Sequence, residues 1–196
     1  MNLDFHLLKV VCLGIGLSAA CGFRVFIPLL AVSMAGYFDW LSLPSDMQWM
    51  ATLTAIICFG TAALVEIGAY YVPFLDNLLD IIATPLAVIA GSLLAFAIFP
   101  IPEDDHLTRF ILGLITGGIT AGVIQTGTGL LRLFSTKATI GTGNVLIATG
   151  ENAAAVSVTI LTFLVPVLAA LLLLTLAGWL LYRTLRRLLT REKQIY

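Results

Sequence analysis

Charge is scarce in this sequence of 196 residues. Only 11% of the residues are Asp, Glu, Lys or Arg, whereas a soluble domain carries about 25%. The ten basic and eleven acidic residues give a net charge of −1, so no excess of positive charge is available for binding nucleic acid. Polar stretches long enough to form a separate soluble domain are missing as well. These shortages exclude a soluble enzyme, a disordered chain and a nucleic-acid-binding protein.

Sequence motifs for catalysis, metal binding and disulfides are also missing. The three cysteines, Cys12, Cys21 and Cys58, lie in apolar segments without CxxC or Cys/His spacing, so we expect neither a disulfide framework nor a zinc site. The two histidines, His6 and His106, flank apolar segments, and no HExxH, GxSxG or P-loop pattern occurs. We therefore expect no enzyme activity, no cofactor and no metal ion.

Apolar residues, by contrast, make up 60% of the chain, and the mean hydropathy is +1.05. A helical membrane span needs roughly 20 apolar residues. Apolar segments occupy residues 7–37, 50–72, 78–99, 107–134 and 153–182. They predict an all-α, polytopic transmembrane bundle that forms a single domain over residues 1–196. We expect the first segment to be one tilted span, and we expect helix breaks at Pro28, Pro85 and Pro166.

Basic residues in short loops favour the cytoplasmic side of a membrane. Lys9 therefore predicts a cytoplasmic N-terminus. Arg132 and Lys137 predict that the loop after the fourth apolar segment is cytoplasmic, and the basic residues of 183–196 predict a cytoplasmic tail. The acidic loops without such residues are expected on the outside; they contain Asp39, Asp46 and residues 103–105. Together these assignments require an even number of crossings, about six.

Two solutions supply the extra crossing. Either the run 153–182 forms a hairpin bent at Pro166, or the Gly-rich stretch 140–150 crosses or re-enters the membrane as a broken helix. Both place non-helical backbone at membrane depth. Such backbone must be sheltered by protein or line a cavity, so this region is a candidate for function.

Small residues recur at four-residue spacing on two of the apolar segments. They are Gly14, Ser18, Gly22, Gly113, Gly117, Gly118 and Gly122. A stripe of this kind lets the backbones of two helices approach closely, so we expect these residues to pack helices together. The alternative is that a stripe lines a narrow path or forms the seam of a homodimer.

An acid–Asn pair followed by a proline occurs twice in the chain, as Asp76-Asn77 with Pro85 and as Glu151-Asn152 with Pro166. A helix rich in small residues precedes each pair. This order indicates two repeat halves, residues 7–99 and 107–182. Three crossings in each half would give an inverted 3+3 repeat, as in many transporters.

Ionisable and polar residues within the apolar segments are the candidates for a polar intramembrane or binding site, because such residues are rare in spans and usually face a cavity or a partner. The candidates are Arg24, Glu66, Asp76, Asn77, Asp80, Gln125, Asn144, Glu151 and Asn152. Arg24 would hold an anionic group or pair with an acid, and the acids would bind a cation or a proton. The structural alternative is a salt bridge that locks helices together.

Two strings in the first half are similar to those of a known family. Residues 19–30 (AACGFRVFIPLL) and residues 75–80 (LDNLLD) followed by Thr84-Pro85 resemble an uncharacterised bacterial membrane family, domain of unknown function 4126. Residues 143–152 resemble it as well, and the resemblance covers residues 16–166. It implies an integral membrane protein and no established activity.

These observations together predict a small multi-pass protein of the cell membrane. We expect a permease or a channel-like transporter of a small ion or solute. The alternative is a membrane scaffold or a lipid-handling protein that does not transport. The expected partners are membrane lipids, the transported ion or solute and a second copy of the chain in a homodimer.

Overall fold

The computed structural model describes residues 2–102, 104–139, 142–173, 175, 178–179 and 182, without the side chains of residues 2–4, 73, 74, 76–78 and 80. The described part of the chain contains helices, turns and loops and no strand, which confirms the all-α class. The helices are α1 (Asn2–Cys21), α2 (Phe26–Tyr37), the 3-10 helix η1 (Ser45–Ala51), α3 (Leu53–Ala69), α4 (Pro73–Ile98), α5 (His106–Leu112), the π-helix η2 (Gly113–Gly118), α6 (Ile119–Thr139) and α7 (Asn144–Leu164).

Within the described residues, three helices are long and apolar enough to cross a membrane. They are Ile81–Ile98 within α4, His106–Thr139, which joins α5, η2 and α6, and α7. A fourth span is present if η1 and α3, which are bent by 61° at their junction, are counted as one. The expected number of six crossings stays a prediction.

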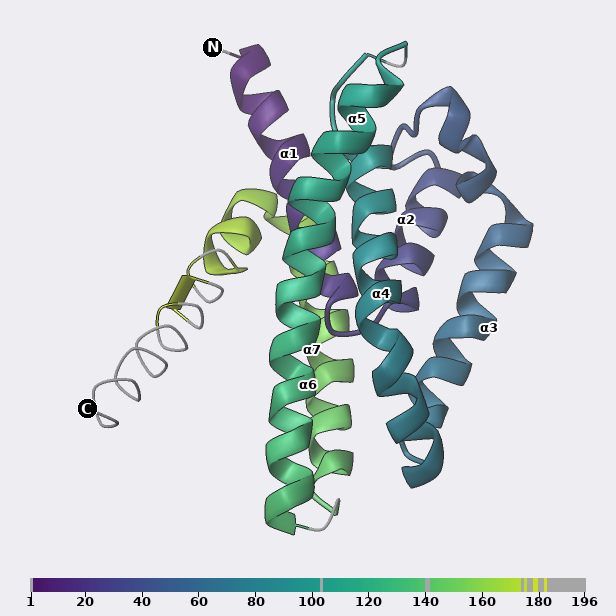
Figure 1. The fold of residues 1–196 in the computed structure, drawn as a ribbon. Coiled ribbons are helices and arrows are strands. Elements are labelled where there is room, and N and C mark those ends of the chain that lie inside the picture. The colour runs from purple at the N-terminus through teal and green to yellow at the C-terminus, as the bar shows by residue number, and fades with distance from the viewer. Residues whose placement is uncertain are drawn as a thin grey trace.

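The first apolar segment folds back on itself instead of crossing in one direction (Figure 1). α1 runs antiparallel to α4, and the hydroxyl of Ser18 donates a hydrogen bond to the carbonyl of Gly91 at 2.8 Å. α2 then returns towards the end where α1 begins, and the hydroxyl of Ser33 donates to the carbonyl of Met50 at 2.5 Å. The expected single span with a break at Pro28 is therefore wrong. Pro28 lies in the first turn of α2, where backbone N–H groups have no partner within the helix.

The reversal takes place halfway along the longest span. Residues 110–131 of that span carry no charged side chain and are roughly 33 Å long. The turn touches the middle of this stretch, because a Cβ added at Gly22 would lie 2.6 Å from both the carbonyl oxygen of Ala121 and the Cβ of Ile124. Only a glycine fits such an approach. α1 and α2 therefore form a hairpin that enters the bundle and returns to the same end, which we call the re-entrant hairpin, and its turn lies beside the middle of this long helix.

The two later prolines have different effects on their helices. α4 continues unbroken through Pro85, which corrects the expected break there. Neighbouring helices can satisfy the backbone groups that a proline frees. α7 ends at Leu164, and Val165 lies outside any helix directly before Pro166.

The chain turns back after this second break. Towards the end of α7, Thr162 lies against α1 at Gly16, where an added Cβ would lie 2.5 Å from its side chain. The residues at 166–173 are helical again, and Leu173 packs with Ala19 and Ile124, nearer the middle of the bundle. Residues 144–150 form the start of α7, so no separate broken helix occupies them, and the second arm of a hairpin at Pro166 lies partly outside the described residues.

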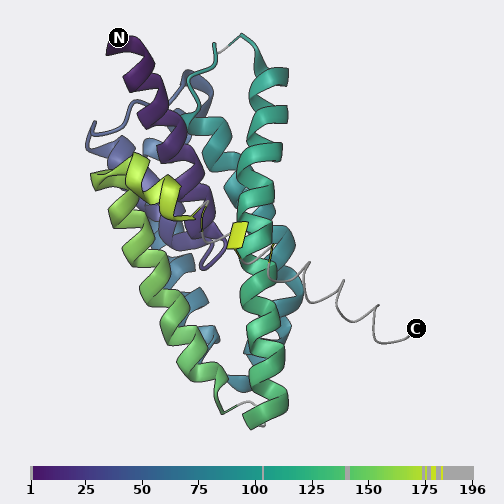
Figure 2. The same cartoon turned by 90° about the vertical axis from the view of Figure 1, so that its left-hand side faces the viewer.

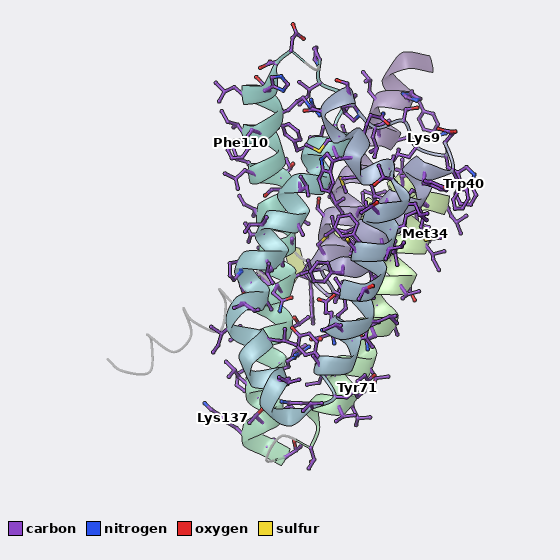
Figure 3. The ribbon with its side chains drawn as sticks, turned by 90° about the vertical axis from the view of Figure 1, so that its right-hand side faces the viewer. Lys9, Met34, Trp40, Tyr71, Phe110 and Lys137 are labelled. Carbon is purple, nitrogen blue, oxygen red and sulfur yellow. The ribbon has the colours of Figure 1, made fainter. Side chains whose placement is uncertain are left out.

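Both ends of the re-entrant hairpin lie at one end of the bundle. Figure 3 shows Lys9, Trp40 and Phe110 in the upper half and Tyr71 and Lys137 towards the lower end. The start of α1 therefore shares its end with the two acidic loops. The expectation that the N-terminus and these loops face opposite sides counted this hairpin as one crossing, and the side that each of them faces stays a prediction.

Large aliphatic side chains cover the outside of the bundle, while its interior holds mainly small and aliphatic residues with a minority of polar ones. Leu64, Ile81 and Leu146 are 74%, 74% and 77% exposed, and many similar residues surround them on α3, α4, α6 and α7. α6 and α7 meet at the lower end and diverge upwards, with α1 between their upper parts (Figure 2). An apolar outer surface over a core that also contains buried polar and charged residues is typical of helices packed in a bilayer.

Small residues permit the closest helix contact in the fold. A Cβ added at Gly117 of η2 would overlap the carbonyl of Gly91 and lie 2.7 Å from the Cβ of Ala95 on α4. Gly113 and Gly118 face the same helix at equally short range. Gly14 lies against Phe99, whereas Gly122 makes a looser contact with α4. The π-helical turn at η2 thus coincides with the place where α4 touches this span.

A buried arginine links three helices at the upper end of the bundle. Arg109 of α5 is fully buried, and it donates to Asp46 of η1 at 3.1 Å and to the carbonyl of Phe96 at 3.1 Å. Asp105 caps the start of α5 and accepts a hydrogen bond from the backbone N–H of Thr108 at 3.1 Å. Hydrogen bonding by Thr108 holds the pKa of this carboxyl below its usual value.

Candidate functional site

Arg24 lies in the turn of the re-entrant hairpin and ties it to α7. Its Nη1 lies 2.9 Å from Oε2 of Glu151, and its Nε donates to Oδ1 of Asn152 at 2.5 Å. Its Nη2 donates to the carbonyl of Ala148 at 3.2 Å. The side chain is 1% exposed, so these three partners on one helix replace water around the guanidinium. Such replacement is what a buried arginine requires.

A second buried arginine shares the same acid. Arg132 of α6 is 2% exposed, and its Nε donates to Oε1 of Glu151 at 3.1 Å while its Nη2 donates to Oε2. The guanidinium carbons of Arg24 and Arg132 lie 3.8 and 4.0 Å from the ring centroid of Tyr70. A carboxylate that bridges two guanidiniums over one aromatic ring therefore joins α1, α3, α6 and α7 at a single point.

Glu66 of α3 supports the same turn from the other side. Its two carboxylate oxygens accept hydrogen bonds from the backbone N–H groups of Val25 and Phe26, at 2.9 and 3.1 Å. These groups begin α2, where the helix dipole favours a negative charge. Glu66 therefore fixes the position of the first turn of α2, just as Glu151 fixes the position of the Arg24 guanidinium.

The described side chains leave one polar path from the surface to Arg24. Asn152, which accepts from Arg24, donates through its Nδ2 to the hydroxyl of Tyr71 at 3.3 Å. That hydroxyl lies 3.1 Å from the hydroxyl of Thr149, and both residues are exposed. Tyr71 lies towards the lower end of the bundle (Figure 3). Asn152 thus links Arg24 to two exposed hydroxyl groups through hydrogen bonds.

We call this set of residues the Arg24 cluster; it consists of Arg24, Glu66, Tyr70, Arg132, Glu151 and Asn152. Its formal charges are two positive and two negative. The described residues contain no group of three His, Cys, Asp or Glu side chains placed to hold a metal ion. The arrangement is thus suited to ion pairing and hydrogen bonding.

The structure brings four of the residues predicted from the sequence to this cluster, namely Arg24, Glu66, Glu151 and Asn152. Two others lie elsewhere. Gln125 is buried on α6 about two turns before Arg132, and Asn144 donates to the hydroxyl of Thr136 at 3.0 Å where α7 begins. Asp76, Asn77 and Asp80 lie in the first turns of α4, and their side chains are outside the described part of the chain.

Sequence reasoning missed three contributors. Arg132 looked like a loop residue next to Lys137, but α6 continues to Thr139 and holds it inside the bundle. Tyr70 and Tyr71 lie at the end of the apolar segment 50–72 and were not singled out. The sequence did indicate them indirectly, because Glu66 lies one helical turn before these tyrosines. This spacing places an acidic group and aromatic groups at the same end of one helix.

Comparison with known protein families finds a match for this chain. The sequence profile described as Domain of unknown function (DUF4126) matches residues 11–187. The chain belongs to this family. The match confirms the resemblance inferred from residues 19–30 and 75–80. Neither a curated protein nor a solved structure matches the chain. The matched region contains the whole Arg24 cluster of this DUF4126 protein, and the family description assigns no activity to it.

Proposed function

We propose that this protein is an integral protein of the cell membrane that acts as a small permease, with the Arg24 cluster as its gate. The observation that carries the proposal is the position of Arg24. It lies in the turn between α1 and α2, beside the middle of an uncharged stretch as long as a bilayer core, and it is paired with an acid on a third helix.

The membrane part of this proposal rests on the apolar helices and on the surface. Aliphatic side chains as exposed as Leu64 and Leu146 would be costly in water over so large an area, and they suit contact with lipid. Four candidate spans, counting the bent η1–α3 pair, surround the re-entrant hairpin. The residues after Pro166 would have to cross once more to bring the basic tail to the side of Lys137.

The transport part rests on broken helices and buried charge. In many transporters the substrate site lies where discontinuous helices meet near the bilayer midplane. Ionisable residues at such depth usually mark a pathway for ions or solutes. Here Arg24 is the charged side chain by which the hairpin turn touches α7, so a solute entering from Tyr71 would have to bind Arg24 and Glu151 in place of their ion pair in order to pass. An inverted repeat gains no support, since α4 and α7 run in the same direction (Figure 1).

We expect the start of α1 and the loop before α5 to face one side of the membrane and Lys137 the other. Single cysteines at Phe5, Asp104 and Lys137, in a background without native cysteines, test this with a membrane-impermeant maleimide on sealed vesicles. Phe5→Cys and Asp104→Cys should react from the same side, and Lys137→Cys from the opposite side. Reaction of Phe5→Cys and Lys137→Cys from one side would mean that the hairpin crosses the membrane. The positive-inside tendency places Lys137 in the cytoplasm.

Flux measurements on proteoliposomes test the transport proposal. The probes are entrapped pyranine with a potassium chloride gradient and valinomycin, which reports ion and proton flux, and light scattering in hyperosmotic glycerol, which reports a neutral solute. We expect flux above that of protein-free vesicles with at least one probe. Arg24→Ala should abolish it, whereas Lys137→Ala, which removes an exposed charge, should preserve it. Equal flux in both variants would contradict the assignment of the gate.

The second candidate is a scaffold or lipid-handling protein that transports nothing. The observation that favours it is the dry, fully paired state of Arg24, which is 1% exposed. This candidate predicts that a stoichiometric partner protein copurifies from membranes, which a permease does not need.

Under either proposal the protein is not an enzyme and binds no nucleic acid. Its partners are lipids, a small ion or solute in the case of a permease, and a second copy of the chain.

A further inference from the structure

A cavity of about 150 Å³ lies beside the hairpin turn, between the start of α2, α3 and α4. It is open on one side. Its walls include Ala62 and Val65 of α3, Ile82 and Ala83 of α4, and Phe26 of α2. Transport through the Arg24 cluster does not need this cavity, because the polar path from Tyr71 runs along α7 instead.

The walls exclude water and charged ligands. Almost every lining group is aliphatic or aromatic, and the carboxylate at its inner end, that of Glu66, is already held by two backbone N–H groups. A water molecule needs two to four polar partners to be stable in a cavity. An apolar cavity of this size stays dry and takes an apolar molecule as large as benzene.

The opening faces the apolar outer surface. Val65 and Ile82 at its rim are 65% and 44% exposed, and their neighbours in sequence, Leu64 and Ile81, are each 74% exposed. α3 packs mainly on α2 and meets α4 at few places, so the groove between α3 and α4 is not closed by protein. A second protein helix, about 10 Å wide, is too thick to enter. A hydrocarbon chain is thin enough.

We propose that the cavity holds the end of one acyl chain of a bilayer phospholipid. An empty void beside lipid loses the dispersion contacts that its walls would otherwise make, and a flexible chain restores them without any polar partner. The occupant contacts Phe26 and Glu66, the two residues that join α2 to α3. It thus fills the space beside the hairpin turn, and this role holds whether or not the protein transports a solute.

Photocrosslinking of the full-length protein in phosphatidylcholine nanodiscs tests this assignment. The probe is a phosphatidylcholine with a diazirine near the end of one acyl chain, and labelled peptides are mapped by mass spectrometry. We expect labelling to concentrate at the cavity walls on α3 and α4. Ala83→Phe fills the cavity and should lower that labelling about tenfold. Ala153→Phe adds the same side chain at an exposed position of α7 and should leave it unchanged.

Ala62→Phe fills the cavity from the opposite wall and replaces Ala83→Phe if that variant does not fold. Two outcomes would overturn the proposal. One is labelling spread evenly over the exposed faces of α3 and α4 and unaffected by either filling variant. The other is labelling of the walls by a free aryl diazirine of benzene's size but not by the lipid, which would show that the site takes a small free molecule. Neither outcome bears on the flux of Arg24→Ala.

Discussion

Replacing Glu151 by glutamine should lower the free energy of unfolding by about 3–5 kcal/mol, the cost of removing one partner from a buried ion pair. Its carboxylate contacts both Arg24 and Arg132, which are 1% and 2% exposed. A neutral amide leaves two buried guanidiniums with their shared counter-ion removed. Arg24→Gln should cost less, because the acid then keeps Arg132.

Reversible unfolding of the purified variants in bicelles gives this comparison. Asp104→Asn is the matched control, since it makes the same change of acid to amide at an exposed loop position and should stay within about 0.5 kcal/mol of the original protein. A cost for Glu151→Gln as small as that of the control would mean that the acid does not bridge the two arginines. A cost for Arg24→Gln above that of Glu151→Gln would contradict the sharing of one acid.

Gly117→Ala should destabilise the fold by about 1–3 kcal/mol, as overpacking does. The added methyl group would overlap the carbonyl of Gly91 and press on Ala95, so α4 would have to move away from η2. Gly127→Ala makes the same change ten residues later in α6, where nothing lies within 4 Å. It should be neutral or stabilise by up to about 1 kcal/mol, because alanine is the better helix former.

The two substitutions are expected to change the free energy of unfolding in opposite directions, so comparing them is informative. The same unfolding measurement applies to both variants. A loss of stability in Gly127→Ala as large as in Gly117→Ala would show that the helix needs glycine for its own backbone. Equal, small effects would show that α4 and η2 do not approach as closely as the structure places them.

The amount of apolar sequence predicts the helices well, but not the direction in which they run. The segments at 50–72 and 78–99 correspond to α3 and α4 with small shifts at their ends. Residues 7–37 are long enough for one span, and hydropathy has the same value whether the chain continues or turns back. The distinguishing feature was Gly22 followed closely by Arg24 in the middle of that segment.

Four of the six residues of the Arg24 cluster were accessible to sequence reasoning, and Arg24 and Glu66 stand out as charges within apolar segments. Their partners were not accessible, since Glu66 holds the backbone of α2 and Glu151, more than a hundred residues away from Arg24, holds its guanidinium. Partners of this kind depend on which helices pack together, and a single sequence does not contain that information.

Proline was a poor guide to helix breaks in this chain. Pro85 lies inside a continuous helix, whereas the largest break, between Cys21 and Phe26, contains no proline. Glycine and a charged residue with a distant partner cause that break. The close contact of Gly22 and the pairing of Arg24 stabilise the turn once the helices are packed, so local propensity alone does not reveal it.

Flux through proteoliposomes, normalised to folded protein, tests the central claim most directly when Glu151→Gln is compared with Lys137→Ala. The account predicts that Lys137→Ala carries the same flux as the original protein, while Glu151→Gln falls to the level of protein-free vesicles, because a solute must bind both charges of the Arg24–Glu151 pair in order to pass. Undiminished flux in Glu151→Gln would contradict this, and it would assign the Arg24 cluster to holding the fold together.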